Sequence, residues 1–309
     1  MRKTSVYLPD HLKRALAARA AAVGRSEAEV LRGAVEAEVA AGHRAAPPPA
    51  ADAPRPGRLV GVGVGPGDPD LLTVRALTAL RRADRVLAPA TAPDAVGRAE
   101  TIVRQAAPDV RVERAPFTMH PDPAARAAAM GEIAARVVGH LGDGEEVAFI
   151  TLGDPLTYST FSALADEVRA RRPESTVEVV PGIMAFQSLA ARTGTTLVDE
   201  RQRLSVRTAL DGEDLTGELA HELSDPDRTV VLYKGGRRLP ELAAVARACG
   251  RLDAAVAGEL LGMTGERIGP LADLASGPAS YLATVIVPAT AGGGSAPEAA
   301  VIADEGPRQ

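Results

Sequence analysis

From Arg58 onwards, short apolar runs alternate with segments of helical period, and this alternation constrains the fold more than any other feature. The first run, RLVGVGV at 58–64, predicts a buried strand and leads through a glycine-rich turn into a helix. Strands that alternate with helices build layered α/β folds, so this body of about 230 residues should contain one or two cores. Further strands are predicted at Arg85–Ala88, Val147–Thr151, Val177–Val180, Leu204–Thr208, Thr229–Lys234, Ala254–Glu259 and Ala283–Pro288, and helices at 70–82, 122–140, 157–172, 183–193 and 239–249.

A proline-rich segment separates this body from a shorter N-terminal region. Residues 45–57, AAPPPAADAPRPG, contain five prolines and no periodic apolar pattern, which is typical of a semi-rigid linker. A length of 309 residues fits two domains and a small appendage. The predicted organisation is a module at 1–44, a linker at 45–57, α/β domains at 58–181 and 182–288, and a flexible tail at 289–309.

Charge and composition exclude several classes of protein. Residues 1–46 hold eight Lys or Arg and five acids, a net +3, which leaves −8 on the rest of a chain whose net charge is −5. The single cysteine excludes an internal disulfide, and the five histidines lack ligand spacing, so no metal site is predicted. No apolar run approaches the roughly 18 residues of a membrane span, and no signal peptide is evident. We expect a cytoplasmic protein with no membrane contact.

The N-terminal module has clear start and stop signals. KTSVYL at 3–8 alternates with a period of two, which predicts a strand. Pro9-Asp10 should begin a helix that Gly24 ends. Ser26 should begin a second helix, with Glu29 completing a capping box. About 40 residues cannot bury a core alone, so the unit should dimerise.

This strand–helix–helix pattern, carried by KTSVYLPDHLKRAL and GRSEAEVLRGAV, resembles the ribbon-helix-helix DNA-binding domains over residues 2–40. The resemblance implies that Lys3, Ser5 and Tyr7 face DNA bases from a two-stranded ribbon. The main-chain amides at Gly24–Ser26 would contact a backbone phosphate. The alternative is a module that serves dimerisation only.

Three Gly/Pro turns follow three predicted strands of the body. They are Gly65-Pro66-Gly67-Asp68-Pro69, Gly153-Asp154-Pro155 and Pro181-Gly182-Ile183. Ligands of open α/β sheets bind beyond the carboxyl ends of strands, and glycines let main chain approach a ligand closely. We therefore expect a pocket formed by backbone atoms, although each turn alone is an ordinary tight turn.

Other nucleotide and hydrolase motifs do not fit. The Gly63–Asp68 segment lacks GxGxxG spacing, and the chain has no P-loop and no GxSxG elbow. HELSD at 221–225 has Asp225 where a zinc protease helix needs its second histidine, so a solvated helix end is the better interpretation.

Together the turns resemble the tetrapyrrole methylase family from about Arg58 to Pro288. The matching stretches are VGVGPGDPDLLTVRAL, GDPLTYSTFSALADEV, VEVVPGIMAFQSLAARTG, VVLYKGGRRLPEL, GMTGERI and SYLATVIVP. Within the family they look most like the precorrin-2 C20-methyltransferase branch of cobalamin biosynthesis. The resemblance implies a homodimer of two-domain α/β subunits that bind S-adenosylmethionine between the domains and methylate a tetrapyrrole.

Position by position, the resemblance implies a set of cofactor-binding residues on the turns. They are Pro66, Gly153, Asp154, Thr157, Met184, Ala185, Tyr233, Lys234 and Gly262. Thr157 departs from the apolar residue common in the family, and Tyr233-Lys234 from the methionine that many members carry. These departures concern the branch and the pocket contacts.

Two further sets of side chains are predicted from the chemistry. A weak base would help a proton leave the methylated carbon, and Asp68 and Tyr158 are candidates on the ligand-facing turns. A helix N-cap is the favoured interpretation of Asp68, and packing is an alternative for Tyr158. A substrate with many carboxylates suits arginine, so Arg75, Arg201, Arg203, Arg237 and Arg238 are candidate substrate-binding residues, each alternatively a solvated surface residue.

Several functional alternatives stay open at the level of sequence. The leading hypothesis is methylation of precorrin-2, or of its cobalt-bound counterpart cobalt-factor II, at C20. A DNA-binding regulator whose methylase-like body senses S-adenosylmethionine or a tetrapyrrole would retain the same turns. Methylation elsewhere on the macrocycle is the third possibility.

Overall fold

The computed structural model describes residues 10–34, 57–92, 94–117, 122–210, 214–277 and 279–290. Its contacts divide the chain into two units, Met1–Pro54 and Arg55–Gln309. Each unit is described separately below.

In the first unit, α1 spans Asp10–Val23 and is followed by Gly24 in the left-handed conformation at φ +64°. Ser26 begins the next helical segment, 27–34. The Glu29 amide donates to Ser26 Oγ over 3.3 Å, and Glu29 Oε2 accepts from the Ser26 amide over 2.9 Å. The predicted helix end and capping box are therefore confirmed. The predicted strand with Lys3, Ser5 and Tyr7 lies outside the described residues.

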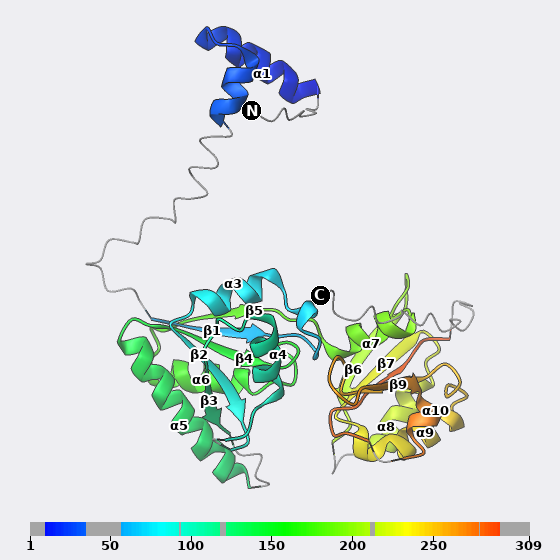
Figure 1. The fold of residues 1–309 in the computed structure, drawn as a ribbon. Coiled ribbons are helices and arrows are strands. Elements are labelled where there is room, and N and C mark those ends of the chain that lie inside the picture. Colours follow the sequence, from blue (N-terminus) through cyan, green and yellow to red (C-terminus); the bar gives the residue numbers. More distant parts are fainter. Residues whose placement is uncertain are drawn as a thin grey trace. The chain divides into compact units, whose positions relative to one another are not determined.

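The second unit begins with a lobe built on a parallel sheet of strand order β3-β2-β4-β1-β5 (Figure 1). Neighbouring strands all run in the same direction, so their carboxyl ends meet at one edge. The strands are β1 Arg58–Gly63, β2 Arg85–Ala90, β3 Val112–Pro116, β4 Glu146–Thr151 and β5 Thr176–Val180.

Helices cover both faces of this sheet. Val60 and Val62 of β1 point into a core with α3 (Val74–Arg82) and α4 (Arg98–Ala106). Leu59 points to the other face, into a core with α5 (Pro123–Gly142) and α6 (Phe161–Arg171). The alternation along β1 thus produces a three-layer lobe, as expected for a parallel sheet.

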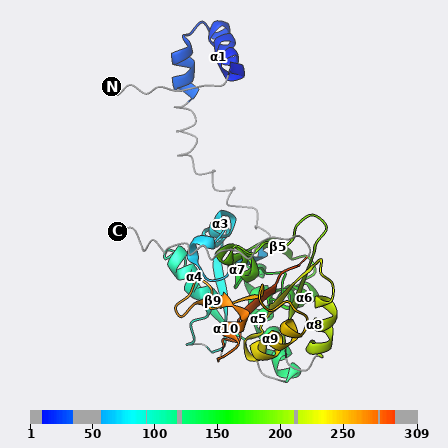
Figure 2. The same cartoon turned by 90° about the vertical axis from the view of Figure 1, so that its right-hand side faces the viewer.

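The second lobe contains a mixed sheet of order β6-β7-β10-β8-β9, which lies towards the viewer in Figure 2. Only β6 and β7 are parallel; the other neighbours pair antiparallel. One face packs on α8, α9 and α10, and the other packs on α7. The elements are α7 Ala185–Thr193, β6 Arg203–Thr208, α8 Leu215–Leu223, β7 Arg228–Tyr233, α9 Leu239–Ala248, β8 Val256–Glu259, β9 Arg267–Pro270, α10 Leu271–Leu274 and β10 Thr284–Val287.

The predicted α/β fold is confirmed, and all eight predicted strands are present with ends shifted by a few residues. Sequence reasoning missed β3, β9, α4, α8 and α10. The helix predicted at 70–82 begins only at Val74, because Pro69–Leu71 form a separate 3-10 turn, η1, and Thr73 caps the helix. HELSD does lie at a helix end: α8 stops at Leu223 and His221 is exposed.

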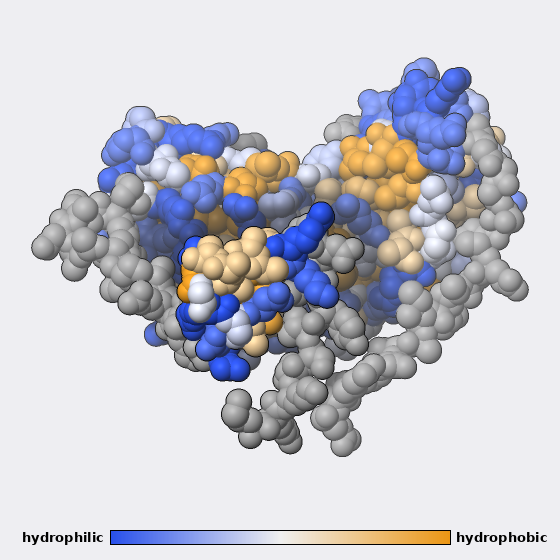
Figure 3. All heavy atoms as spheres, turned by 90° about the horizontal axis from the view of Figure 1, so that it is seen from above, coloured by the Kyte–Doolittle hydropathy of each residue, from blue (hydrophilic) through white to orange (hydrophobic). Residues whose placement is uncertain are grey.

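Seen from above, both lobes of the second unit carry apolar patches among hydrophilic side chains (Figure 3). Within the described ranges, no helix combines the length and the apolar character needed to cross a bilayer.

Candidate functional site

The three Gly/Pro turns converge at the carboxyl edge of the parallel sheet. The Gly153 amide donates to the Gly65 carbonyl over 2.8 Å, which joins the first turn to the second. The Asp154 carboxylate joins the second turn to the third, because its Oδ2 accepts from the Gly182 amide over 3.1 Å. Its Oδ1 accepts from the Leu156 amide over 2.9 Å and fixes the turn itself. The turns therefore form one hydrogen-bonded assembly.

Glycine is required where these turns meet. A Cβ atom on Gly63 would stand 2.5 Å from the Gly153 carbonyl oxygen and 2.6 Å from the Gly182 amide nitrogen. A Cβ atom on Gly182 would overlap the Gly153 carbonyl oxygen in turn. The atoms in the way are main chain of two other turns, so they cannot rotate aside as a side chain would. Close backbone contact thus sets the shape of this edge.

The second lobe completes the site with the loop Leu260–Met263. A Cβ on Gly67 would overlap the Leu261 carbonyl oxygen, and a Cβ on Gly262 would overlap the Asp68 amide nitrogen. Gly262 also has φ +67°, which other residues rarely adopt. The first turn of one lobe and this loop of the other are therefore packed backbone against backbone.

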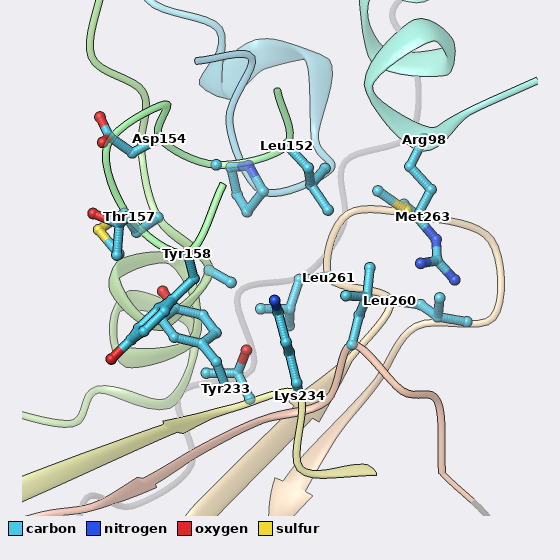
Figure 4. A pocket seen from close by; sticks show the side chains of 16 residues that line it. Arg98, Leu152, Asp154, Thr157, Tyr158, Tyr233, Lys234, Leu260, Leu261 and Met263 are labelled. Carbon is cyan, nitrogen blue, oxygen red and sulfur yellow. The ribbon is translucent and has the colours of Figure 1, made fainter. Parts of the chain in front are cut away.

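These segments line one cavity between the lobes (Figure 4). It encloses about 820 Å³ including the part open to solvent, a size typical of small-molecule sites. Most of its wall is apolar side chain and main chain, with a few polar groups. The lining residues are Pro66, Arg98, Leu152, Gly153, Asp154, Thr157, Tyr158, Met184, Ala185, Tyr233, Lys234, Leu260, Leu261, Met263, Leu282 and Thr284.

Unfavourable backbone conformations gather at this cavity. Among the described residues, four other than glycine have positive φ, and three of them line it: Tyr158 at +49°, Lys234 at +59° and Leu260 at +53°. Each costs roughly 1–2 kcal/mol relative to an ordinary conformation. Strain that the surrounding fold maintains at one place is typical of functional sites.

Two tyrosines connect the lobes on one side of the cavity. Tyr158 follows β4 of the first lobe, and its hydroxyl donates to the Val206 carbonyl of β6 over 2.8 Å. Its ring meets Tyr233 edge-on at 6.1 Å between centroids, and Tyr233 meets Phe186 in the same way at 6.3 Å. Burial raises the pKa of the Tyr233 phenol well above its ordinary value. The Tyr233 phenol therefore stays protonated, and both tyrosine rings act as packed walls of the cavity.

Some polar groups of the cavity wall have hydrogen-bond or ion-pair partners among the described residues, and others do not. The only carboxylate in the wall, that of Asp154, already accepts two amides. Burial without a counter-ion lowers the pKa of Lys234. Thr284 is fully buried, and its Oγ1 has no hydrogen-bond partner among the described residues. The Thr284 hydroxyl is thus a buried polar group beside the cavity that the described residues leave unsatisfied.

The structure brings most of the predicted cofactor-binding residues to this cavity. Pro66, Gly153, Asp154, Thr157, Met184, Ala185, Tyr233 and Lys234 line it, and Gly262 lies between two lining residues. Cofactor binding itself stays a prediction for each of them. The sequence did not single out Arg98, Leu282 or Thr284 as site residues. Leu282 and Thr284 lie in the family-like stretch SYLATVIVP, and Met263 lies in GMTGERI, so these stretches were the available signal. No such signal marks Arg98.

The two predicted bases have different surroundings. Asp68 is absent from the cavity wall, and its Oδ1 accepts from the Asp70 amide over 2.9 Å. It is thus an N-cap, although of η1 rather than of the following helix, whose cap is Thr73. Tyr158 lines the cavity, but its hydroxyl is engaged with Val206.

The five arginines predicted to bind substrate all lie outside the cavity wall. Arg203 pairs with Asp225 at 2.7 Å, and Arg238 pairs with Glu241 at 2.6 Å. Arg75, Arg201 and Arg237 are exposed. As for metals, the described part of the chain has no group of three His, Cys, Asp or Glu side chains that could hold an ion.

Comparison with known proteins identifies this architecture. A precorrin-2 C(20)-methyltransferase of Sinorhizobium sp is 36% identical over 241 residues, which are 75% of this chain and 95% of the relative. A cobalt-precorrin-2 C(20)-methyltransferase of Salmonella typhimurium is 35% identical over 201 residues, 65% of this chain and 82% of the relative. The fold is similar to that of a uroporphyrin-III C-methyl transferase from Thermus thermophilus complexed with S-adenosyl homocysteine, with a TM-score of 0.51, 22% identity, and coverage of 75% and 92% of the two chains.

The family model of the tetrapyrrole (corrin/porphyrin) methylases matches residues 58–275. This range holds the whole parallel sheet, every strand of the second sheet except β10, and the three turns that converge on the cavity. The chain therefore belongs to the tetrapyrrole (corrin/porphyrin) methylase family.

Proposed function

We propose that this chain transfers a methyl group from S-adenosylmethionine to C20 of precorrin-2, or of its cobalt-bound counterpart, in cobalamin biosynthesis. The observation that carries the proposal is the match to the precorrin-2 C(20)-methyltransferase of Sinorhizobium sp over 95% of that relative, together with the cavity at the converging turns. The proposed subunit has methylase domains at 58–181 and 182–288 and works as a homodimer.

The cavity suits a folded S-adenosylmethionine molecule. Leu152, Met184 and Met263 provide apolar surface, and Thr284 Oγ1 is a buried hydroxyl without a partner. A Cβ atom on Gly153 would meet nothing within 4 Å, so the main chain of the second turn is open to close approach. We propose that the nine residues predicted from the sequence hold the donor chiefly through their main chain.

When bound, S-adenosylmethionine supplies a methyl group that its sulfonium already activates. The protein's part is then to hold donor and acceptor carbon in line and to exclude water. The turns suit this role, because they are hydrogen-bonded to one another and cannot spread without breaking those bonds. Tyr158 and Tyr233 close one side by packing between the lobes.

Neither predicted base is poised to take the proton that leaves the methylated carbon. Asp68 is outside the wall, and the Tyr158 hydroxyl is hydrogen-bonded to a carbonyl. We propose that Tyr158 orients the lobes and that the methylated carbon loses its proton to solvent only after methyl transfer, once water regains access to it.

The decisive experiment incubates the purified chain with labelled S-adenosylmethionine and precorrin-2, and in parallel with the cobalt-bound tetrapyrrole. We expect one methyl group per macrocycle, detected as a mass increase of about 14 Da, with NMR placing it at C20. Binding of both ligands without turnover would instead favour the sensor hypothesis, and methyl at another carbon would exclude the C20 assignment.

We also propose that residues 1–44 form a ribbon-helix-helix-like module that dimerises the chain and contacts DNA through Lys3, Ser5 and Tyr7. Its support is the helix, glycine turn and capping box at Asp10–Glu29. A gel shift of the full chain against promoter DNA of neighbouring genes tests it, with Lys3→Ala as the variant. A salt-sensitive shift that the variant weakens is expected; the absence of any shift would leave dimerisation as the role, measured by ultracentrifugation.

A further inference from the structure

Two cationic side chains reach into the cavity from opposite lobes without a carboxylate partner. Arg98 is the first residue of α4 in the first lobe, and Lys234 follows β7 in the second. Figure 4 shows the guanidinium of Arg98 and the ammonium of Lys234 directed into the cavity. Neither forms an ion pair or side-chain hydrogen bond with another described residue.

This lack of partners is unusual in the second unit. Most of its arginines are paired; Arg58, for example, contacts Glu146 and Glu178, and Arg114 contacts Glu100. The one carboxylate in the cavity wall, Asp154, is occupied by main-chain amides. Among the described residues that line it, the cavity therefore holds two cations, Arg98 and Lys234, and one anion, Asp154.

The turn that carries Lys234 is held rigidly. Its φ of +59° turns the chain sharply after β7. The Gly235 amide donates to the Ala283 carbonyl over 3.3 Å, and a Cβ on Gly236 would overlap the Ser280 carbonyl oxygen. These neighbours fix the backbone of the turn at the cavity, and the ammonium group points into the cavity (Figure 4). A half-buried cation without a counter-ion is unfavourable until an anion binds beside it.

We propose that Arg98 and Lys234 bind carboxylate groups of the tetrapyrrole substrate, one from each lobe, and so orient the macrocycle across the cavity. The inference rests on the proposed function, because it takes a polycarboxylate tetrapyrrole as the substrate. The methyl donor fits the pair less well: it has one carboxylate accompanied by an ammonium and a sulfonium, whereas the substrate has many carboxylates and no cation. Arg98, although exposed, and the half-buried Lys234 line the cavity, and they replace the five predicted arginines, which lie outside its wall, as substrate-binding groups.

The test measures two affinities in the full chain. The probe for the tetrapyrrole is uroporphyrin III, a stable octacarboxylate whose fluorescence reports binding, and the probe for the donor site is S-adenosyl homocysteine, measured by calorimetry. The variants are Arg98→Gln, Lys234→Met and the charge-preserving Lys234→Arg. Arg111→Gln is the matched control, because Arg111 is exposed on the same lobe and absent from the cavity wall.

We expect Arg98→Gln and Lys234→Met each to weaken uroporphyrin binding roughly tenfold, as expected when a charge-assisted hydrogen bond is lost. Lys234→Arg and Arg111→Gln should stay within about threefold of wild type. Arg98→Gln should leave the affinity for S-adenosyl homocysteine unchanged, and Lys234→Met should change it by less than about threefold, because Lys234 is proposed to hold the donor through its main chain. Circular dichroism shows whether each variant is folded.

Three results would overturn the proposal: unchanged uroporphyrin affinity in both neutral variants, an equal loss of S-adenosyl homocysteine affinity, or an equal loss in the Arg111 control. The outcome is separable from that of the proposed function. If wild type binds uroporphyrin through the two cations but does not methylate precorrin-2, the proposed function fails alone. If it methylates precorrin-2 with a KM that both neutral variants leave unchanged, the cation pair fails alone.

Discussion

Replacing Gly63 by alanine tests the convergence of the three turns most directly. Gly63 is the last residue of β1, and an added Cβ would stand 2.5 Å from the Gly153 carbonyl oxygen, 2.6 Å from the Gly182 nitrogen and 2.7 Å from the Gly182 Cα. Ordinary carbon–oxygen contacts are about 3.3 Å or longer, so the second and third turns would have to retreat by roughly 1 Å.

The cost follows from what this retreat disrupts. Overpacking in a rigid region costs about 1–3 kcal/mol, and loss of one turn-to-turn hydrogen bond adds about 1 kcal/mol. Alanine restricts the unfolded chain and offsets less than about 1 kcal/mol of this. We therefore expect Gly63→Ala to destabilise the fold by about 2–4 kcal/mol, which lowers the Tm by about 5–15 °C in a unit of this size.

The assay combines thermal melting with calorimetric titration of S-adenosyl homocysteine. Affinity should fall as well, because the displaced turns line the cavity. Gly139→Ala is the matched control: Gly139 lies in α5, and its Cβ would meet nothing within 4 Å, so this substitution should raise stability by about 0.5–1 kcal/mol. A Gly63→Ala protein that melts within about 2 °C of wild type and binds the ligand normally would refute the proposed packing of the turns.

Three further predictions concern single side chains. Tyr158→Phe removes a hydrogen bond worth about 1 kcal/mol, so kcat should fall only about fivefold, and a thousandfold loss would mean that the phenol carries the proton after all. Glu100→Gln should lower the free energy of unfolding by about 1–3 kcal/mol at pH 7. Hydrogen bonding from Arg114 lowers the pKa of Glu100, so the carboxylate stabilises the fold at pH values above its ordinary pKa of 4.5. In melts at different pH, the difference between variant and wild type should therefore shrink as the pH falls below 4.5. Lys234→Met should have a higher Tm than wild type at pH 7, because burial lowers the pKa of Lys234 and its charged form therefore opposes folding. This difference in Tm should vanish as the pH rises towards 10.5. A lower Tm of the variant at pH 7 would contradict this account.

The patterns that sequence reasoning used are local, and local features account for its successes. The run at 58–64 and the run in β4 became strands because uninterrupted apolar residues are buried between layers, whereas the more polar β5 and β6 are only partly buried. Ser26 and Glu29 cap a helix through contacts three residues apart. Helix α8 was missed although Leu215, Leu219 and Leu223 recur every four residues and form its buried face. The short elements β3 and β9 were missed, because VERAP and RIGP carry no strong period of their own. Their structure depends on neighbours far along the chain.

The sequence by itself determined the alternation of strands and helices, the glycines of the turns and the family resemblance, because each depends on residues close together in the chain. Only the tertiary structure decided which cationic side chains form ion pairs and which line the cavity without one. Arg203 pairs with Asp225, 22 residues further along the chain, and Arg238 pairs with Glu241 only three residues on, while Arg98 and Lys234 meet no carboxylate among the described residues. An ion pair such as Arg203–Asp225 depends on the distance between residues that are remote in sequence, so the sequence alone could not show that this cation is paired and that Arg98 and Lys234 line the cavity.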